Sequence, residues 1–203
     1  MKNQAMLYGI IGFLLGIVLT ALTASNAVNS NNQGMMRMMG MGNQSATSSN
    51  VDKHFIEQMI PHHEDAIDMA NLAKEKSVNK DILTLSDNIM ASQSSEIELM
   101  KTWYKNWFGY DVPEDTSMSV KSGMMHEGVM EDDTDFDVLK NSVDFDKAFI
   151  KEMIPHHQMA VVMAKMLEQA STRPEMKKLA QDIITAQTKE IEMMKEWQKS
   201  WGH

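Results

Sequence analysis

The chain has no cysteine, few aromatic residues (6%) and no excess of positive charge. Without cysteine there is no disulfide framework, thiolate metal site, cysteine nucleophile or lipidated N-terminal cysteine. The formal net charge of -9 argues against a nucleic-acid partner, because a phosphate backbone calls for a basic surface. An acidic surface is compatible with cation binding, although solubility is its commoner reason. The length of 203 residues is enough for one ordinary domain with extensions.

Methionine is unusually abundant, with 22 residues in a chain of 203. Thioethers are soft, uncharged ligands that suit Cu(I) or Ag(I) better than Mg or Ca. Methionine also fills irregular gaps in hydrophobic cores. The position of each methionine therefore decides between a ligand and a packing role.

The sequence repeats itself. The phrase Met-Ile-Pro-His-His occurs at 59–63 and again at 153–157. A shift of 94 residues aligns 52–109 with 146–203 without a gap, and 24 of the 58 aligned pairs are identical. A gapless repeat of this length indicates duplicated structural units.

Two segments precede the repeats. Residues 1–27 combine Lys2 with an uncharged apolar run over 7–22, which predicts a signal peptide or a membrane anchor formed by 5–24. Either one places the rest of the chain outside the cytoplasm, in the periplasm or its equivalent. Residues 28–50 are predicted to be a flexible linker. Its methionines have no evident packing role and are candidate accessory ligands: Met35, Met36, Met38, Met39 and Met41.

Apolar residues recur at helical spacing over 51–76 and 145–170, and each stretch is followed by a short turn and a second periodic stretch, to about 108 and 202. These patterns predict an all-α domain over 51–203, an antiparallel four-helix bundle built from two duplicated hairpins. An acidic, methionine-containing connection at 110–145 joins the repeats and contains one short helix near 135–143. Thr172 and Glu175 predict a capping box for the last helix.

Pro61 and Pro155 lie inside the periodic stretches that carry the histidines. A proline removes one backbone hydrogen bond and kinks or breaks a helix. Because the periodicity runs through both sides, we expect a kinked but continuous helix rather than a break at Ile60.

The four paired histidines fall into two classes, since neighbouring residues on a helix point about 100° apart. His63 and His157 lie in the middle of the apolar face, and His62 and His156 lie on its flank. Glu96 and Glu190 are at the right level to partner the central pair. A structural network would explain that pair without a metal, yet imidazole is also the commonest metal ligand.

On the flank of the second repeat, His156 shares a narrow arc with Met159, Met163 and Met166. The arc lies off the centre of the apolar face, so these methionines are predicted to be soft-metal ligands rather than core filler. The matching positions of the first repeat are His62, Asp65, Met69 and Leu72. We therefore expect tighter binding in the second hairpin. In the connection, Met124, Met125 and His126 form a candidate labile site.

Several enzyme classes are excluded by pattern. No Glu stands three residues before a His, as a di-iron carboxylate centre requires. The chain contains no zinc-protease H-E-x-x-H and no phosphate loop. We expect a binding protein rather than an enzyme.

Residues 55–70 and 149–164, with the closing phrases 93–97 and 187–191 and the tryptophans after them, resemble the signature of domain-of-unknown-function family 305. The resemblance implies a ferritin-like four-helix bundle in an exported or membrane-anchored protein. The family includes CopM-like periplasmic proteins that bind copper and silver and contribute to copper resistance. Family ligand positions carry over to His62, His63, His156, His157, Met59, Met69, Met153 and Met163. Gln93, Glu96, Gln187 and Glu190 match as accessory or second-layer groups.

Together these observations predict an extracytoplasmic protein that binds Cu(I), with Ag(I) as a mimic, for sequestration, resistance or trafficking. Its expected partners are metal ions, a copper-handling protein, and the membrane if residues 1–27 are retained. Two alternatives stay open: an oxidoreductase with a metal at the bundle centre, and a structural envelope protein whose histidines only satisfy its core.

Overall fold

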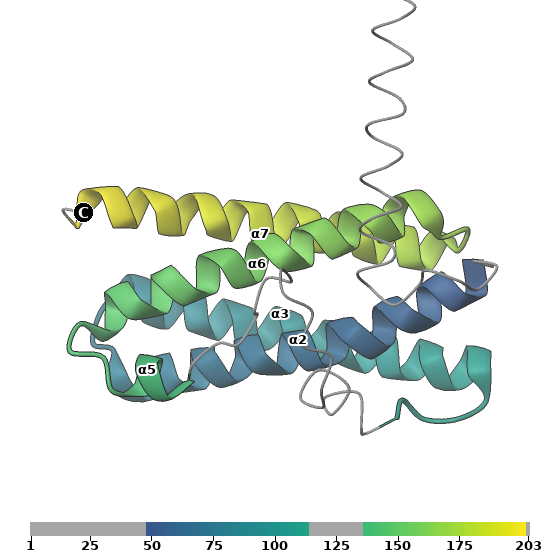
Figure 1. Cartoon of the computed structure of the whole chain (residues 1–203), viewed down its shortest axis with the longest axis horizontal. Coiled ribbons are helices and arrows are strands. Elements are labelled where there is room, and N and C mark those ends of the chain that lie inside the picture. The colour runs from purple at the N-terminus through teal and green to yellow at the C-terminus, as the bar shows by residue number, and fades with distance from the viewer. Residues whose placement is uncertain (1–47, 114–135, 202–203) are drawn as a thin grey trace, which may run out of the picture. The chain divides into compact units, whose positions relative to one another are not determined.

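The computed structural model describes residues 48–113 and 136–201. Within these ranges the chain forms five helices: α2 (Ser48–Lys76), α3 (Lys80–Phe108), α5 (Phe136–Lys140), α6 (Phe145–Ala170) and α7 (Pro174–Ser200). Figure 1 shows two long hairpins, α2 with α3 and α6 with α7, that lie against each other. The described residues contain no β-strand. The prediction of an all-α helical bundle from duplicated hairpins is confirmed.

The helices that carry the histidines are continuous. α2 runs through Pro61 and α6 runs through Pro155, so the alternative of a break at Ile60 is wrong. One missing N–H removes a single bond from the helical ladder, and tertiary packing on both sides of the proline keeps the helix formed. The four histidines therefore lie on unbroken helices whose faces are defined by the packing around them.

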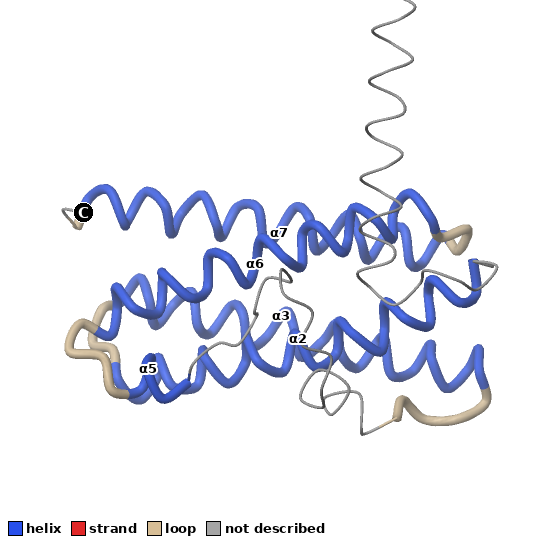
Figure 2. The backbone as a smooth tube through the Cα atoms, in the orientation of Figure 1, coloured by secondary structure: helices blue, strands red, loops and turns tan. Residues whose placement is uncertain are grey.

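The turns repeat as the sequence does. Ser77 Oγ accepts a hydrogen bond from Asn79 N at 3.1 Å, and Ser171 Oγ accepts one from Arg173 N at the same distance. Asn79 also caps α3, because its side chain accepts from the backbone N of Asp81 at 2.9 Å. Short turns of this kind make the helices of each hairpin antiparallel neighbours, as Figure 2 shows.

The two hairpins meet mainly through α2 and α6, the helices that carry the histidines. Ala66, Ala70, Ala160 and Ala164 follow the histidines along these helices and are completely buried. Small side chains let helix backbones approach closely, so these alanines are suited to the contact between α2 and α6. The seam between the repeats is thus built by the histidine segments themselves.

The predicted short helix before the second repeat is confirmed as α5, five residues long. Leu139 is completely buried, and α5 packs against α6. None of the helices in the described residues has the length and apolarity needed to cross a membrane. The predicted signal or anchor at 1–27, residues 28–47 of the predicted linker and most of the 110–145 connection lie outside the described residues. The end of the predicted linker is wrong, because residues 48–50 belong to α2.

Candidate metal centre

His62 and His156 lie across the seam between the hairpins. Their rings stack with centroids 3.7 Å apart and planes 2° from parallel, and both side chains are buried. His62 Nε2 lies 3.2 Å from the backbone carbonyl oxygen of His156. A carbonyl oxygen only accepts, so this nitrogen of His62 carries the proton. The expectation that these two histidines form a class of their own, at a seam, agrees with this arrangement.

His63 and His157 each bond to a glutamate of their own hairpin. The Nε2 atoms lie 2.7 Å from Glu96 Oε2 and Glu190 Oε2, and both rings are completely buried. An ionised carboxylate accepts, so each Nε2 donates its proton and each Nδ1 keeps its lone pair. Carboxylates that hold a histidine in this way orient it toward a metal in many metalloproteins. Glu96 and Glu190 therefore fix the orientation of the two central imidazoles.

Several buried polar atoms of the histidines and of the inner-face glutamines have no hydrogen-bond partner among the described residues. A donor or acceptor left unpaired in a protein interior costs roughly 1–3 kcal/mol, so such atoms suggest ligands that are not part of the chain. The unpartnered atoms near the histidines are His63 Nδ1, His157 Nδ1, both ring nitrogens of His156, Gln93 Oε1 and Gln187 Oε1. They fall at matching positions of the two repeats, with the exception of His156.

The methionines predicted as ligands occupy three kinds of position. Met59, Met153 and Met69 are completely buried, and Met163 is 8% exposed. Met159 and Met166 are half-buried on α6. The expectation that Met159, Met163 and Met166 of α6 lie outside the core is therefore wrong for Met163. The flank of one isolated helix becomes interior once the neighbouring hairpin covers it, and angular counting along α6 does not include that neighbour.

A family model described as "Domain of unknown function (DUF305)" matches residues 52–198. The chain belongs to the DUF305 family. A structure titled "CopM in the Cu(II)-bound form" is 47% identical, covers 74% of this chain and 97% of its own, and has a TM-score of 0.66. "CopM in the Cu(I)-bound form" is 43% identical, covers 75% of this chain and 98% of its own, and has a TM-score of 0.63.

A DUF305 fragment from Deinococcus radiodurans is 28% identical over 72% of this chain and 93% of its own, with a TM-score of 0.57. Among curated proteins, an uncharacterised protein of Acanthamoeba polyphaga mimivirus, L153, is 45% identical over 49 residues. That match covers 24% of this chain and 32% of the relative, so this chain spans about a third of the viral protein.

Burial favours the neutral form of two histidines in this DUF305 domain, His63 and His156. Desolvation lowers the pKa of His63 despite the bond to Glu96. Desolvation, followed by the other histidines, lowers the pKa of His156 further. A neutral imidazole has a lone pair to offer, whereas a protonated one has none.

Within residues 48–113 and 136–201, no three His, Asp or Glu side chains are grouped to hold a metal ion.

The remaining predicted ligands, Met35, Met36, Met38, Met39, Met41, Met124, Met125 and His126, lie outside the described residues.

Sequence reasoning missed one buried charge near the other end of the DUF305 bundle. Asp52 is completely buried, 3.1 Å from Arg173 Nε, and the Arg173 guanidinium lies 4.1 Å from the centroid of a Trp107 ring. The one signal in the sequence for this buried residue was that Asp52 aligns with an identical residue, Asp146. That signal is weak, because a polar residue near the start of a helix usually lies at the surface.

Proposed function

We propose that this DUF305 chain binds Cu(I) as cargo outside the cytoplasm, through imidazole nitrogen and methionine sulfur, for sequestration or transfer. The observation that carries the proposal is the set of buried imidazole nitrogens without partners: Nδ1 of His63, Nδ1 of His157, and both nitrogens of His156. CopM, whose solved forms are titled Cu(II)-bound, Cu(I)-bound and Ag-bound, supports it as a relative with 43–47% identity.

The alternative of a purely structural network explains part of the centre. Glu96 and Glu190 each satisfy one nitrogen of a buried histidine. Such a network leaves four buried imidazole nitrogens unexplained, each at a cost of roughly 1–3 kcal/mol. A metal ion that accepts the lone pairs of His63 Nδ1, His157 Nδ1 and one nitrogen of His156 removes most of that cost. We therefore favour a ligand role over a role in the core alone.

The preferred oxidation state follows from the donors. His156 shares α6 with Met159, Met163 and Met166, and a row of sulfur beside imidazole suits Cu(I) and its mimic Ag(I). The first hairpin has Asp65 and Leu72 where the second has Met159 and Met166. We assign the tighter site to the second hairpin, with Met35–Met41 as an accessory group. The export segment predicted at 1–27 places this binding outside the cytoplasm.

The test is a competition for Cu(I) between the purified protein and a chromophoric chelator under anaerobic, reducing conditions. We expect tight binding that raises the melting temperature, because a ligand of the native state stabilises it. Changing His156→Ala, Met159→Leu and Met163→Leu together should abolish the tight site and leave the helical circular dichroism unchanged.

A matched control changes the five methionines at 35–41 to leucine and leaves the bundle intact. We expect this control variant to keep the tight site. If the control loses Cu(I) and the bundle variant keeps it, the linker is the binding element and the assignment to α6 is wrong. If the unaltered protein does not compete for Cu(I), the proposed function itself is wrong.

A further inference from the structure

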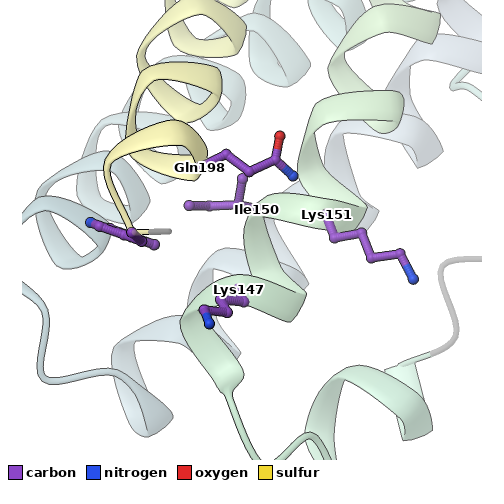
Figure 3. Close-up of a pocket in the computed structure, with 5 residues that line it drawn as sticks. Lys147, Ile150, Lys151 and Gln198 are labelled. Atoms are coloured by element: carbon purple, nitrogen blue, oxygen red, sulfur yellow. The ribbon is translucent and has the colours of Figure 1, made fainter. Parts of the chain in front are cut away.

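The second hairpin has a small open hollow where the start of α6 meets the end of α7. Five residues line it: Lys147, Ile150, Lys151, Gln198 and Trp201. Figure 3 shows Ile150 next to Gln198 where α6 faces α7, with Lys147 below them and the Lys151 side chain extending away from both. The volume is about 160 Å³, close to the ~150 Å³ that admits a benzene ring in a protein.

Each lining residue has a counterpart 94 residues earlier: Lys53, Ile56, Glu57, Tyr104 and Trp107. In the first hairpin, side chains of the protein itself fill the corresponding place. The Tyr104 ring is completely buried, and its hydroxyl donates to Glu57 Oε1 at 2.6 Å. Lys53 Nζ lies 3.8 Å from the same carboxylate oxygen, and Tyr110 contacts Tyr104 edge to face at 5.5 Å.

Two exchanges separate the repeats at this place. Glu57 is replaced by Lys151, and Tyr104 is replaced by Gln198. The second hairpin therefore lacks both the carboxylate and the aromatic ring of the first, while it keeps the lysine, isoleucine and tryptophan that surrounded them. Among the described residues, one acidic side chain pairs with either lysine: Asp144 Oδ2 lies 3.1 Å from Lys147 Nζ. Lys151 is exposed, and its side chain extends away from Ile150 and Gln198.

We propose that this hollow is a docking site for an aromatic side chain next to a carboxylate on a partner protein. The ring would lie against Ile150 and Trp201, where aromatic and aliphatic surface is available. The carboxylate would meet the Lys151 ammonium, whose exposed side chain reorients at little cost. The occupant thus supplies the two groups that the first hairpin supplies itself. The inference uses no metal ligand and is independent of copper binding.

The test is an NMR titration of the metal-free protein with the blocked peptide acetyl-Gly-Asp-Tyr-Gly-amide. We expect saturable shifts confined to the amides around Lys147–Lys151 and Gln198–Trp201, with an affinity on the order of millimolar, as befits one ring and one exposed ion pair. The blocked peptide acetyl-Gly-Asn-Tyr-Gly-amide lacks the carboxylate and should bind several-fold more weakly.

The matched variant carries K151E and Q198Y, which place the residues of the first hairpin in the second. It should fill the hollow, bind the peptide at least about tenfold more weakly, and keep its Cu(I) affinity. Unchanged binding by the variant, or no saturable shift with the unaltered protein up to tens of millimolar, overturns the proposal. Binding of free N-acetyltyrosine without binding of the blocked peptide also overturns it, because the occupant is then a small aromatic acid.

Discussion

The two hairpins share a backbone plan and differ in what they place on it. Both have an Ile-Pro-His-His segment. In both, a glutamate is hydrogen-bonded to the second histidine and a serine lies in the turn. The second hairpin has methionine where the first has Asp65 and Leu72, and it has lost the Glu57–Tyr104 bond that closes the first. Duplication preserved the histidine framework, and divergence concentrated soft donors and an open hollow in one copy.

The largest expected effect distinguishes the two stacked histidines. His156→Ala should weaken Cu(I) binding by more than about 100-fold, because neither ring nitrogen of His156 has a hydrogen-bond partner and the one without the proton is free to bind the ion. His62→Ala should weaken binding by about tenfold or less, since Nε2 of His62 is already bonded to a carbonyl. Chelator competition measures both. Equal losses would mean that the two rings bind one ion symmetrically.

The glutamates test whether positioning matters equally in the two copies. Glu190→Gln should weaken Cu(I) binding by roughly 10–100-fold, the usual effect of removing a carboxylate behind a histidine ligand. Glu96→Gln should have a smaller effect, because we assign the tighter site to the second hairpin. The histidine ¹⁵N chemical shifts should report loss of the Nε2–H tautomer in each variant. An unchanged affinity with an altered tautomer would limit the glutamates to the core.

Exchanging sulfur between the copies should sharpen the comparison. Asp65→Met with Leu72→Met gives the first hairpin the donors of the second, and we expect about tenfold tighter Cu(I) binding or an additional bound equivalent. Asp65→Leu alone is the control, because it removes the charge without adding sulfur. If the control gives the same gain, loss of the carboxylate and not the thioether explains the difference between the hairpins.

The smallest effect concerns the aligned residues Asp52 and Asp146. Burial raises the pKa of Asp52 above its ordinary value of 3.8, although Ser171 and Arg173 act against the rise. The folded state holds this proton more tightly than the unfolded state does. The stabilising contribution of Asp52 is therefore complete below pH 3.8 and is lost as pH rises through the raised value.

Urea unfolding at a series of acidic pH values measures this contribution. In the unaltered protein, Asp52 should make the free energy of unfolding fall with pH by at most ~1.4 kcal/mol per pH unit. Asp52→Asn should abolish this part of the pH dependence. Asp146→Asn is the matched control, because Asp146 is the aligned residue and is half-exposed in the first turn of α6. A parallel change in both variants would contradict the distinction between the two copies.

The helices, their turns and the central histidine–glutamate pairs were predictable because each depends on residues near in sequence or at one level of a short hairpin. The capping box at Thr172 and Glu175 was wrong: α7 begins at Pro174, and Arg173 is the N-cap, without a side-chain cap. Proline restricts the residue before it to extended backbone, and Arg173 has φ -81° and ψ 126°. The helix therefore starts one residue later than the Thr-x-x-Glu pattern indicates.

The sequence alone determined the duplicated hairpins, the faces on which the histidines lie and the soft character of the available donors, because all three follow from helical spacing and residue chemistry. The tertiary structure alone decided the stacking of His62 on His156, the burial of Met163, the position of Asp52 beside Arg173 and the hollow at Lys151. Helical periodicity specifies which way a side chain points from its own helix. Which neighbour it meets depends on the register between hairpins, and that register is set by packing between residues far apart in the chain.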